Sequence, residues 1–600
     1  MTKIVTIEQM RATETAADAA GLSYTEMMNR AGRVVADHVK QLLEDSGDTR
    51  VAILVGKGNN GGDGLVAGSL IAAETKAIVS FFLVEARDAS DPLFAAIQSA
   101  GLLAVDAATD GEQGYRVLRT MVANADMILD AILGTGAHLP IAGDLEKILR
   151  QVDRALKERA ADHPRPHLIT PNQPSYSGRR NPFILAIDVP SGLDADSGAL
   201  DPLALHADAT ITFEAAKPGL LSFPGADAVG TLHIASLGIP DKTEPLASIT
   251  NTLVDAPYVH NLLPKRPANS SKGTFGKAMI AAGSVNYSGA AALSALGAYR
   301  IGAGLVTVAA PQPVVPSLAG HLLEATWLLL PHDMGVLSKG AARALRKELA
   351  GYSALLIGPG LTQEEPTAEF ISALFQSETP PVKVRTGFGA ASEGQSNADA
   401  PKVKPRAGFG FAPSPIDAPE DKNEPDVPLP PLVIDADGLN LLAKIDDWWT
   451  RLPAHTIITP HPGEFARLAK IEDEGDLKAN ERVQANRVAL AIEKAAAWKV
   501  IVLLKGAHTV IADPDGRVAI LPFANPGLAH AGTGDVLAGM IVGLLAQGLA
   551  PFDAAILAGY VHGYAGELAV MYSGNPASVL ASDVAQHVGD ALTAIEAAGA

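Results

Sequence analysis

NPGLAHAGTGDVLAG, residues 525–539, sets a glycine-rich turn directly before an apolar run. This order predicts a helix whose unpaired N-terminal amides can hold an oxyanion or a phosphate. Asp535 falls in the first turn of that helix, where we expect the helix dipole to keep its carboxylate ionised and able to act as a base. An anion hole beside a base predicts a phosphoryl-transfer centre. The alternative is that Asp535 only caps a core helix, and the motif alone does not exclude it.

Length and charge narrow the class of protein. A chain of 600 residues exceeds one hydrophobic core and predicts two to four domains. Its 47 Lys and Arg against 66 Asp and Glu give a net charge of −19, which argues against a nucleic-acid or anionic-membrane surface. Because there are no cysteines, disulfides, thiolate zinc sites and cysteine nucleophiles are excluded. We find no signal peptide and no apolar run of membrane-spanning length, and we expect a cytoplasmic protein.

The first half of the chain contains a second glycine-rich turn, after two helices and a strand. Residues 7–46 predict two amphipathic helices, and VAILVG (51–56) then predicts a buried parallel strand. The strand leads into GKGNNGGDG (56–64) and a helical pattern, which is typical of a Rossmann-like phosphate or dinucleotide turn. Two Asn and an Asp inside the loop depart from the usual dinucleotide fingerprint. Its glycine content exceeds what a plain turn needs and favours a functional loop.

Two aspartates follow apolar runs further along this half. Asp130 in DMILDAILGTG and Asp188 in FILAIDVPSG would lie at the carboxyl ends of neighbouring parallel strands, where open α/β sheets bind ligands. Each could equally cap the following helix. Gly134-Thr135-Gly136 offers a further backbone anion cradle. Lys217 is a well-placed cation, although a solvated loop lysine is an equally good interpretation.

The motifs GKGNNGGDG, DAILGTG, AIDVPSGLDADSG and TFEAAKPGLLSFPG closely resemble the NAD(P)H-hydrate epimerase domain, over residues 1–240. The resemblance implies that Asp188 contacts the substrate and transfers the proton. It implies a potassium ion held by Asn60, Asp130 and Ser191, which suits hard oxygen ligands. The implied nucleotide-hydrate site is lined by Asn59, Asn60, Gly61, Gly62, Asp63, Gly134, Thr135, Gly136, Ala137, His138, Leu139 and Pro140. Residues 163–182 depart from the family as an irregular insertion, expected to be a surface loop.

Residues 241–259 are bounded by prolines, lack periodicity and predict an interdomain linker. A second α/β run then occupies 260–600, with buried strands that end in glycines or acids. HTIITPHPGEFARL (455–468) places His461 on a loop that enters a helix, where it is either a ligand contact or a capping residue. KVIVLLKGAHTVIADPDGRVAILP (499–522) places Lys505 to Thr509 at a strand end, before a hairpin through Asp515-Gly516.

Residues 377–431 break the pattern, because they are rich in Pro, Gly and charge without any period. We interpret them as a disordered, exterior insertion. The copies RTGFG and RAGFG within it could bind a partner, but a tolerated loop insertion explains them more simply.

The motifs KGTFG, GSVNYSGAA, GPGL, VIDADGLN, TPHPGE, LLKGAHT and NPGLAHAGTGDVLAG resemble the ribokinase-like ADP-dependent NAD(P)H-hydrate dehydratase. The resemblance implies that the adenine nucleotide of ADP, the co-substrate, is held by Lys505, Gly506, Ala507, His508, Thr509 and Gly534. It implies substrate contacts from Ala290, Gly360 and His461, with Asp535 at the reacting group. Mg²⁺ commonly bridges such phosphates, but no metal ligand here is distinctive enough to name.

The two resemblances predict two α/β domains, an N-terminal Rossmann-like sandwich and a C-terminal ribokinase-like fold. The expected function is repair of hydrated NADH and NADPH: the first domain interconverts the R and S forms and the second dehydrates the S form at the expense of ADP. The alternative is a ribokinase-like kinase of small alcohols with a non-catalytic nucleotide-binding N-terminal domain. The expected ligands are small molecules, and we expect a homo-oligomer.

Overall fold

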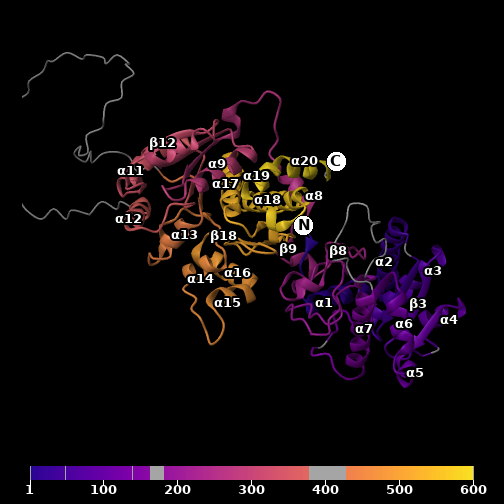
Figure 1. The fold of residues 1–600 in the computed structure, drawn as a ribbon. Helices are drawn as coiled ribbons and strands as arrows, with labels where there is room; N and C mark the ends of the chain where they lie inside the picture. The colour runs from indigo at the N-terminus through magenta and orange to yellow at the C-terminus, as the bar shows by residue number, and fades with distance from the viewer. Residues whose placement is uncertain are drawn as a thin grey trace, which may run out of the picture.

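The computed structural model describes residues 2–47, 49–88, 90–137, 139–162, 181–376 and 428–598. These residues form two α/β units, each built on its own sheet, which lie side by side (Figure 1). Most of both predicted insertions, 163–182 and 377–431, lies outside the described residues.

The N-terminal unit contains a seven-stranded parallel sheet in the order β4-β3-β2-β5-β6-β7-β8. Its strands are β2 (Arg50–Val55), β3 (Ile78–Leu83), β4 (Leu103–Asp106), β5 (Met127–Ala131), β6 (Phe183–Ile187), β7 (Ala209–Phe213) and β8 (Thr231–Ala235). Its helices are α1 (Ile7–Ala19), α2 (Tyr24–Ser46), α3 (Asn59–Glu74), α4 (Pro92–Ser99), α5 (Ala107–Glu112), α6 (Arg116–Asn124) and α7 (Gly143–Asp162). The two amphipathic helices predicted in 7–46 are confirmed as α1 and α2.

The alternation of strand side chains gives this sheet an apolar core on each face. Ile53 of β2 packs with side chains of α2 and α3, while the next residue, Leu54, packs with α6 and α7 on the other side. A sheet covered by helices on both faces explains why these strands are continuously apolar.

The C-terminal unit contains an eleven-stranded mixed sheet in the order β1-β9-β20-β19-β18-β17-β16-β15-β10-β11-β12. Its strands are β1 (Thr2–Lys3), β9 (Asn251–Leu253), β10 (Lys277–Ala281), β11 (Leu305–Pro311), β12 (Thr326–Leu330), β15 (Ala354–Ile357), β16 (Leu432–Ile434), β17 (Ile457–Ile458), β18 (Ile501–Leu504), β19 (Val510–Ala512) and β20 (Val518–Ile520). A separate small hairpin pairs β13 (His332–Asp333) with β14 (Val336–Leu337). The hairpin predicted through Asp515-Gly516 is confirmed as β19 and β20.

Helices cover both faces of this sheet as well (Figure 1). They are α8 (Ala256–Leu262), α9 (Ser288–Arg300), α10 (Val315–Leu318), α11 (Gly340–Glu348), α12 (Glu365–Leu374), α13 (Asp437–Leu442), α14 (Pro462–Ala469), α15 (Ala479–Ala485), α16 (Arg487–Trp498), α17 (Thr533–Ala546), α18 (Pro551–Ser573), α19 (Ala581–Gln586) and α20 (Val588–Ala598). Side chains of α9, α17 and α18 share one core, and those of α11, α12, α14 and α16 share the other.

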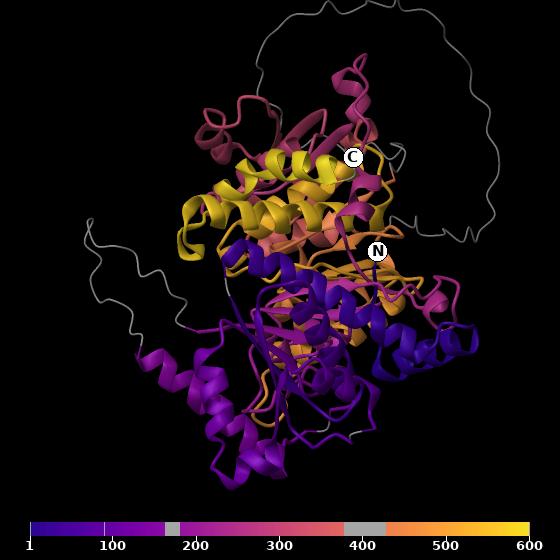
Figure 2. The same cartoon turned by 90° about the vertical axis from the view of Figure 1, so that its right-hand side faces the viewer.

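The two units meet at the start of the chain, which lies between them in both views (Figures 1 and 2). β1 pairs with β9, and β9 pairs with β20, so residues 251–253 belong to the C-terminal sheet. The segment 241–259, expected to be a linker, therefore contains a sheet strand. Its short length, three residues, left no periodicity in the sequence to detect.

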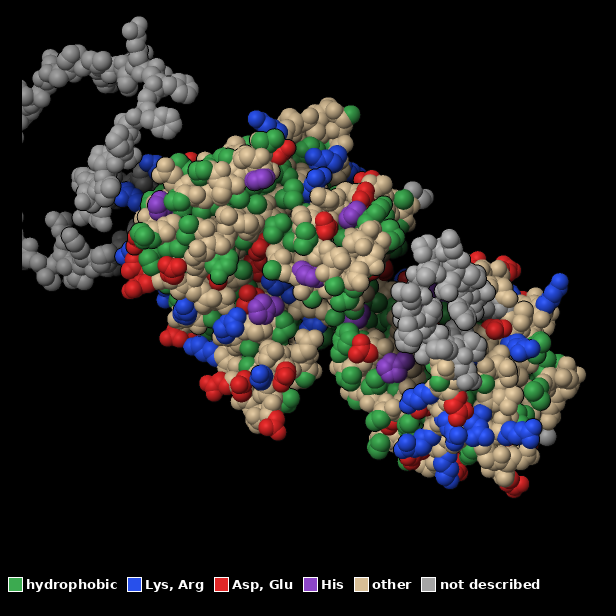
Figure 3. Space-filling view, viewed as in Figure 1, with side chains coloured by type: hydrophobic (Ala, Val, Ile, Leu, Met, Phe, Trp, Pro, Cys, Tyr) green, Lys and Arg blue, Asp and Glu red, His purple; other side chains and the backbone are tan. Residues whose placement is uncertain are grey.

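Charges on the visible surface are interspersed (Figure 3). On α7, for example, the basic side chains form ion pairs within the helix, such as Arg154 with Glu158 and Lys157 with Asp153. Exposed pairs of this kind contribute little to stability, roughly 0–1 kcal/mol each.

Glycines set the contact between α9 and α17, the helix that carries Asp535. A Cβ on Gly539 would lie 2.0 Å from the carbonyl oxygen of Ser294, and one on Gly297 would lie 2.3 Å from that of Val536. Because both obstacles are backbone, neither helix can yield by a side-chain rotation.

Replacing Gly539 with Ala should lower the free energy of unfolding by about 1–3 kcal/mol, because the two helices must separate. Thermal or urea unfolding of the full chain measures this loss. Gly589→Ala on α20 is the matched control, since nothing lies within 4 Å of its Cβ position. The control should be neutral or stabilising by up to about 1 kcal/mol; equal behaviour of the two variants would contradict the packing argument.

Candidate active sites

The N-terminal unit contains a cavity of about 1070 Å³ at the carboxyl ends of its central strands. Of the residues predicted to bind substrate, the cavity is lined by Asn59, Asn60, Asp63, Gly134, Thr135, Gly136 and Asp188. Gly61 and Gly62 are not among the lining residues, and a Cβ on either would lie within 3 Å of the Gly56 backbone or the Met28 side chain. Ala137, Leu139 and Pro140 do not line it, and His138 lies outside the described residues.

The glycine-rich loop after β2 is shorter than the sequence predicts. Helix α3 begins at Asn59, so Asn59 to Asp63 belong to its first turns rather than to the loop. The side chain of Arg87 fastens the remaining loop by donating to the carbonyl oxygen of Gly56 at 2.9 Å. The N-terminal amides of α3 consequently open toward the cavity, an arrangement that suits an anionic ligand.

Asn60, Asp130 and Ser191, the predicted potassium ligands, converge beside Leu133. Ser191 donates through Oγ to Asp130 Oδ1 at 2.6 Å and accepts from the Leu133 amide at 3.0 Å. Asn60 donates to the Leu133 carbonyl at 2.9 Å, which leaves its buried Oδ1 without a hydrogen-bond partner. Burial raises the pKa of Asp130 to about 6. Asp130 therefore does not cap a helix in this structure, and the orphaned amide oxygen is an open acceptor.

Asp188 follows β6 and lies beside the end of β5, as its sequence position predicts. It has a positive φ of 64°, an uncommon conformation for a non-glycine residue. The ammonium of Lys217 donates to its Oδ1 at 2.8 Å, and the Thr212 hydroxyl donates to the same oxygen at 3.1 Å. Lys217 is 1% exposed, so the interpretation of Lys217 as a solvated loop lysine is wrong.

Two further carboxyl groups line the same cavity. Burial and the charge of Asp188 raise the pKa of Glu14 on α1. Burial, Asp188 and Glu14 raise the pKa of Asp63 well above its usual value. Glu14 could not be predicted as a site residue from the sequence, because nothing local distinguishes it from other acids on an amphipathic helix.

The second site lies at the carboxyl ends of the parallel strands in the C-terminal sheet. Asp435 follows β16, His461 follows β17 and Lys505 follows β18. Lys505 donates to the buried Asp435 at 2.7 Å and lies 3.9 Å from Glu464. The Lys505 ammonium is also 3.4 Å from the position of a Cβ on Gly534, so it faces the start of α17.

Asp535 lies in the first turn of α17, whose N-cap is Gly532 with a φ of 92°. The amides of Gly534 and Asp535 have no carbonyl partner within the helix, because they belong to its first turn. Burial and the nearby Asp435 raise the pKa of Asp535 to about 7, against the lowering effect of Lys505. The expectation that the helix dipole keeps this carboxylate fully ionised is therefore wrong: desolvation and a neighbouring acid outweigh the dipole.

The other predicted residues of this site fall into two groups. Ala290 and Gly360 are neighbours, since a Cβ on Gly360 would lie 2.8 Å from that of Ala290. The loop Gly506, Ala507, His508 and Thr509 follows Lys505, and Arg487 holds it by donating to the carbonyl oxygens of Leu504 and Ala507.

His461 is the N-cap of α14, where its Nδ1 accepts from the amides of Gly463 and Glu464. The capping interpretation is thus confirmed, yet the ring also lines a second cavity of about 440 Å³ with Arg467 and Lys478. Burial and the charge of Lys505 lower the His461 pKa to about 4. Burial raises the pKa of Glu464 to about 7. The sequence motifs do not distinguish Asp435 or Glu464 as site residues, although VIDADGLN places Asp435 at a strand end.

Two family profiles match the chain. The profile described as YjeF-related protein N-terminus covers residues 24–219, and the one described as NAD(P)H-hydrate dehydratase covers 278–384 and 408–588. The bifunctional NAD(P)H-hydrate repair enzyme Nnr of Moorella thermoacetica is 32% identical over 93% of this chain and 90% of its own length. That of Salinibacter ruber is 33% identical over 94% and 91%.

The chain belongs to the bifunctional NAD(P)H-hydrate repair enzyme family. Both resemblances seen in the sequence are confirmed by this result. The second profile is interrupted between residues 384 and 408, within the predicted insertion 377–431. A solved structure, the ADP/ATP-dependent NAD(P)H-hydrate dehydratase from Bacillus subtilis co-crystallised with ATP and Mg²⁺, matches with a TM-score of 0.43 and 30% identity, covering 58% of this chain and 99% of that chain. Within the described residues, no helix of this repair-family chain combines the length and apolarity that spanning a membrane requires.

Proposed function

We propose that the two sites divide the repair of hydrated NADH and NADPH between them. The N-terminal site interconverts the R and S forms, and the C-terminal site dehydrates the S form. The observation that supports this division most strongly is that each unit has its own aspartate–lysine ion pair with one buried partner. These pairs are Asp188 with the buried Lys217, and the buried Asp435 with Lys505 beside Asp535. The cytoplasmic location and the homo-oligomeric state stay predictions.

In the N-terminal site, Asp188 is our candidate for proton transfer at the carbinol carbon. Its Oδ1 accepts from Lys217 and Thr212, and its Oδ2 lies 3.5 Å from a Cβ position on Gly134, a residue that lines the cavity. Asp188 would take the proton of the 6-hydroxyl while the bond from the carbinol carbon to the ring nitrogen opens to an aldehyde and the nitrogen takes up a proton. Closure of the ring on the other face of the aldehyde, with both protons returned, would give the other epimer.

Potassium fits Asn60, Asp130 and Ser191 because the set offers oxygen donors only and includes the unpartnered, buried Asn60 Oδ1. When bound there, an alkali cation would supply a fixed positive charge beside the substrate.

Epimerisation should therefore depend on the alkali cation. Its rate in KCl should exceed the rate in a larger-cation salt such as tetramethylammonium chloride, while Asn60→Leu should remove most of the difference. Chromatography of the two epimers over time measures the rate of interconversion in each salt. Equal rates in the two salts would argue against the assignment.

In the C-terminal site, Asp535 would remove the proton of the substrate 6-hydroxyl, whose oxygen then takes the terminal phosphoryl group of ADP. The amides at the start of α17 and the Lys505 ammonium face that group and would stabilise its charge. Phosphate would then leave, driven by the lone pair of the ring nitrogen, and loss of a proton would restore the double bond. Mg²⁺ would neutralise nucleotide phosphates near the carboxylates of Asp435 and Glu464.

The division of labour predicts opposite defects for two variants. Asp535→Asn should reduce dehydration by about 10²–10⁴-fold and spare epimerisation, and Asp188→Asn should do the reverse, because each removes one acid–base group. Both steps are measured in a mixture of both epimers with ADP or ATP. The readout is the return of the absorbance of the reduced nicotinamide.

The control for both variants is Asp153→Asn on the exposed face of α7, which should leave both activities unchanged. If both activities fell together in either variant, the assignment would be wrong. Stable accumulation of a phosphorylated alcohol, without phosphate release, would support the kinase alternative instead.

The raised pKa of Asp535 predicts the pH dependence of dehydration. A base must be ionised to accept a proton, so kcat/KM should rise through about pH 7 and level off above it. Below that pH, it should fall about tenfold per pH unit. Steady-state rates between pH 5 and 9 test the profile, and a rate that stays flat down to pH 5 would exclude Asp535 as the titrating base.

A further inference from the structure

Lys217 is a lysine whose hydrogen-bonding capacity is fully used inside the N-terminal unit. Its Nζ donates to Asp188 Oδ1 at 2.8 Å, to Thr212 Oγ1 at 2.7 Å and to the Phe213 carbonyl at 3.2 Å. An ammonium has three donors, so each proton has an acceptor. Such a group is poorly suited to shuttling protons, because any transfer would break a buried hydrogen bond. It is well suited to holding Asp188 in one orientation.

Other charged side chains surround the pair formed by Lys217 and Asp188. Glu14 on α1 and Asp63 on α3 line the same cavity as Asp188, and Arg11 of α1 also reaches Glu14. Three carboxyl groups in one partly desolvated space repel one another when ionised. Lys217 bonds directly to Asp188 and so holds that carboxylate in one orientation among them.

The backbone beside Lys217 is held from across the domain boundary. The Val5 amide donates to the Ala216 carbonyl at 2.9 Å, and the Ala216 amide donates to the Lys3 carbonyl at 3.0 Å. The N-terminal segment also contacts the C-terminal sheet. The Ile4 amide donates to the Asn251 carbonyl at 3.0 Å, and β1 pairs with β9. One short strand thus connects the residue before Lys217 to the C-terminal sheet.

The chain after Lys217 is anchored to the C-terminal unit as well. Ile4, Ala216 and Leu221 belong to the apolar core that includes Leu253. The ring centroid of Phe223 lies 6.3 Å from that of His508, a residue in the loop after β18. The position of Lys217 is therefore determined by contacts from both units.

We propose that Lys217 is a positioning residue for Asp188, and that β1 and the two residues after it hold it in place by connecting Ala216 to the C-terminal sheet. This inference rests on the proposed epimerase role of the N-terminal site. Lys217 and Thr212 occupy Oδ1 of Asp188, which leaves Oδ2 for the substrate. The C-terminal unit then contributes to epimerisation without touching the substrate of that site.

The test uses Lys217→Met in the full chain, with both epimers as substrate. The expected result is a fall of about 100-fold in kcat for epimerisation, since misplaced catalytic groups lose rate on that scale, with a small change in KM. Added methylammonium should restore part of the rate of Lys217→Ala, because the shorter side chain leaves room for the added cation beside Asp188.

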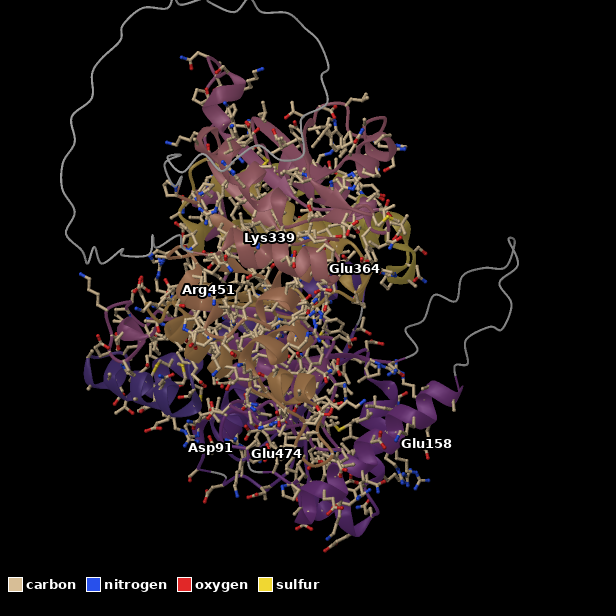
Figure 4. The ribbon with its side chains drawn as sticks, turned by 90° about the vertical axis from the view of Figure 1, so that its left-hand side faces the viewer. Asp91, Glu158, Lys339, Glu364, Arg451 and Glu474 are labelled. Atoms are coloured by element: carbon tan, nitrogen blue, oxygen red, sulfur yellow. The ribbon has the colours of Figure 1, made fainter. Side chains whose placement is uncertain are left out.

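Dehydration of the S form in the same sample should stay unchanged and serves as the internal reference. The matched control is Lys157→Met, whose lysine is exposed on α7 beside Glu158, at the outer side of the N-terminal unit (Figure 4). Unaltered epimerisation by Lys217→Met, or a change in KM alone, would overturn the positioning role. Failure of the unsubstituted protein to epimerise would instead overturn the proposed function.

Ile4→Pro tests the anchor separately, because it removes the amide that donates to Asn251 while keeping Lys217. The expected result is a loss of epimerisation of about tenfold, on the scale of one lost backbone hydrogen bond, with dehydration retained. Normal epimerisation by this variant would overturn the role of β1. If Lys217→Met does not fold, Thr212→Val decides the positioning role, because it removes one acceptor of the ammonium; an unchanged kcat would then count against the proposal.

Discussion

Both sites depend on a lysine that forms an ion pair with an aspartate at the end of a parallel strand. Lys217 pairs with Asp188 in one unit, and Lys505 pairs with Asp435 in the other. Removing a charge from water is costly, and an opposite charge with good geometry offsets much of the cost.

Much of the fold and part of each site follow from local patterns in the sequence. Apolar runs that end in Asp130 and Asp188 predict neighbouring strand ends, because parallel strands bring their carboxyl ends to one edge of a sheet. The same logic identifies Asp535 at a helix start. These features are encoded within about fifteen residues, so the periodicity and the turn residues are sufficient to detect them.

Features that depend on distant contacts could not be predicted. The backbone of Ala216, the residue before Lys217, is held by Lys3 and Val5, more than two hundred positions earlier in the chain. The pKa of Asp535 depends on Asp435, which is one hundred residues away and is one of two acids in VIDADGLN. β9 is too short for any pattern, and α3 begins early because Gly61 and Gly62 allow close packing that a propensity argument cannot detect.

The position of β1 has a consequence for how the protein is made. Its partner, β9, is synthesised about 250 residues later, and β9 in turn pairs with β20, near residue 520. During translation, the first strand must therefore wait until most of the chain has left the ribosome. The helices and sheet of the N-terminal unit can form early, whereas the last contacts around Lys217 form only after the C-terminal sheet exists. Epimerisation should then mature late, as a property of the finished chain.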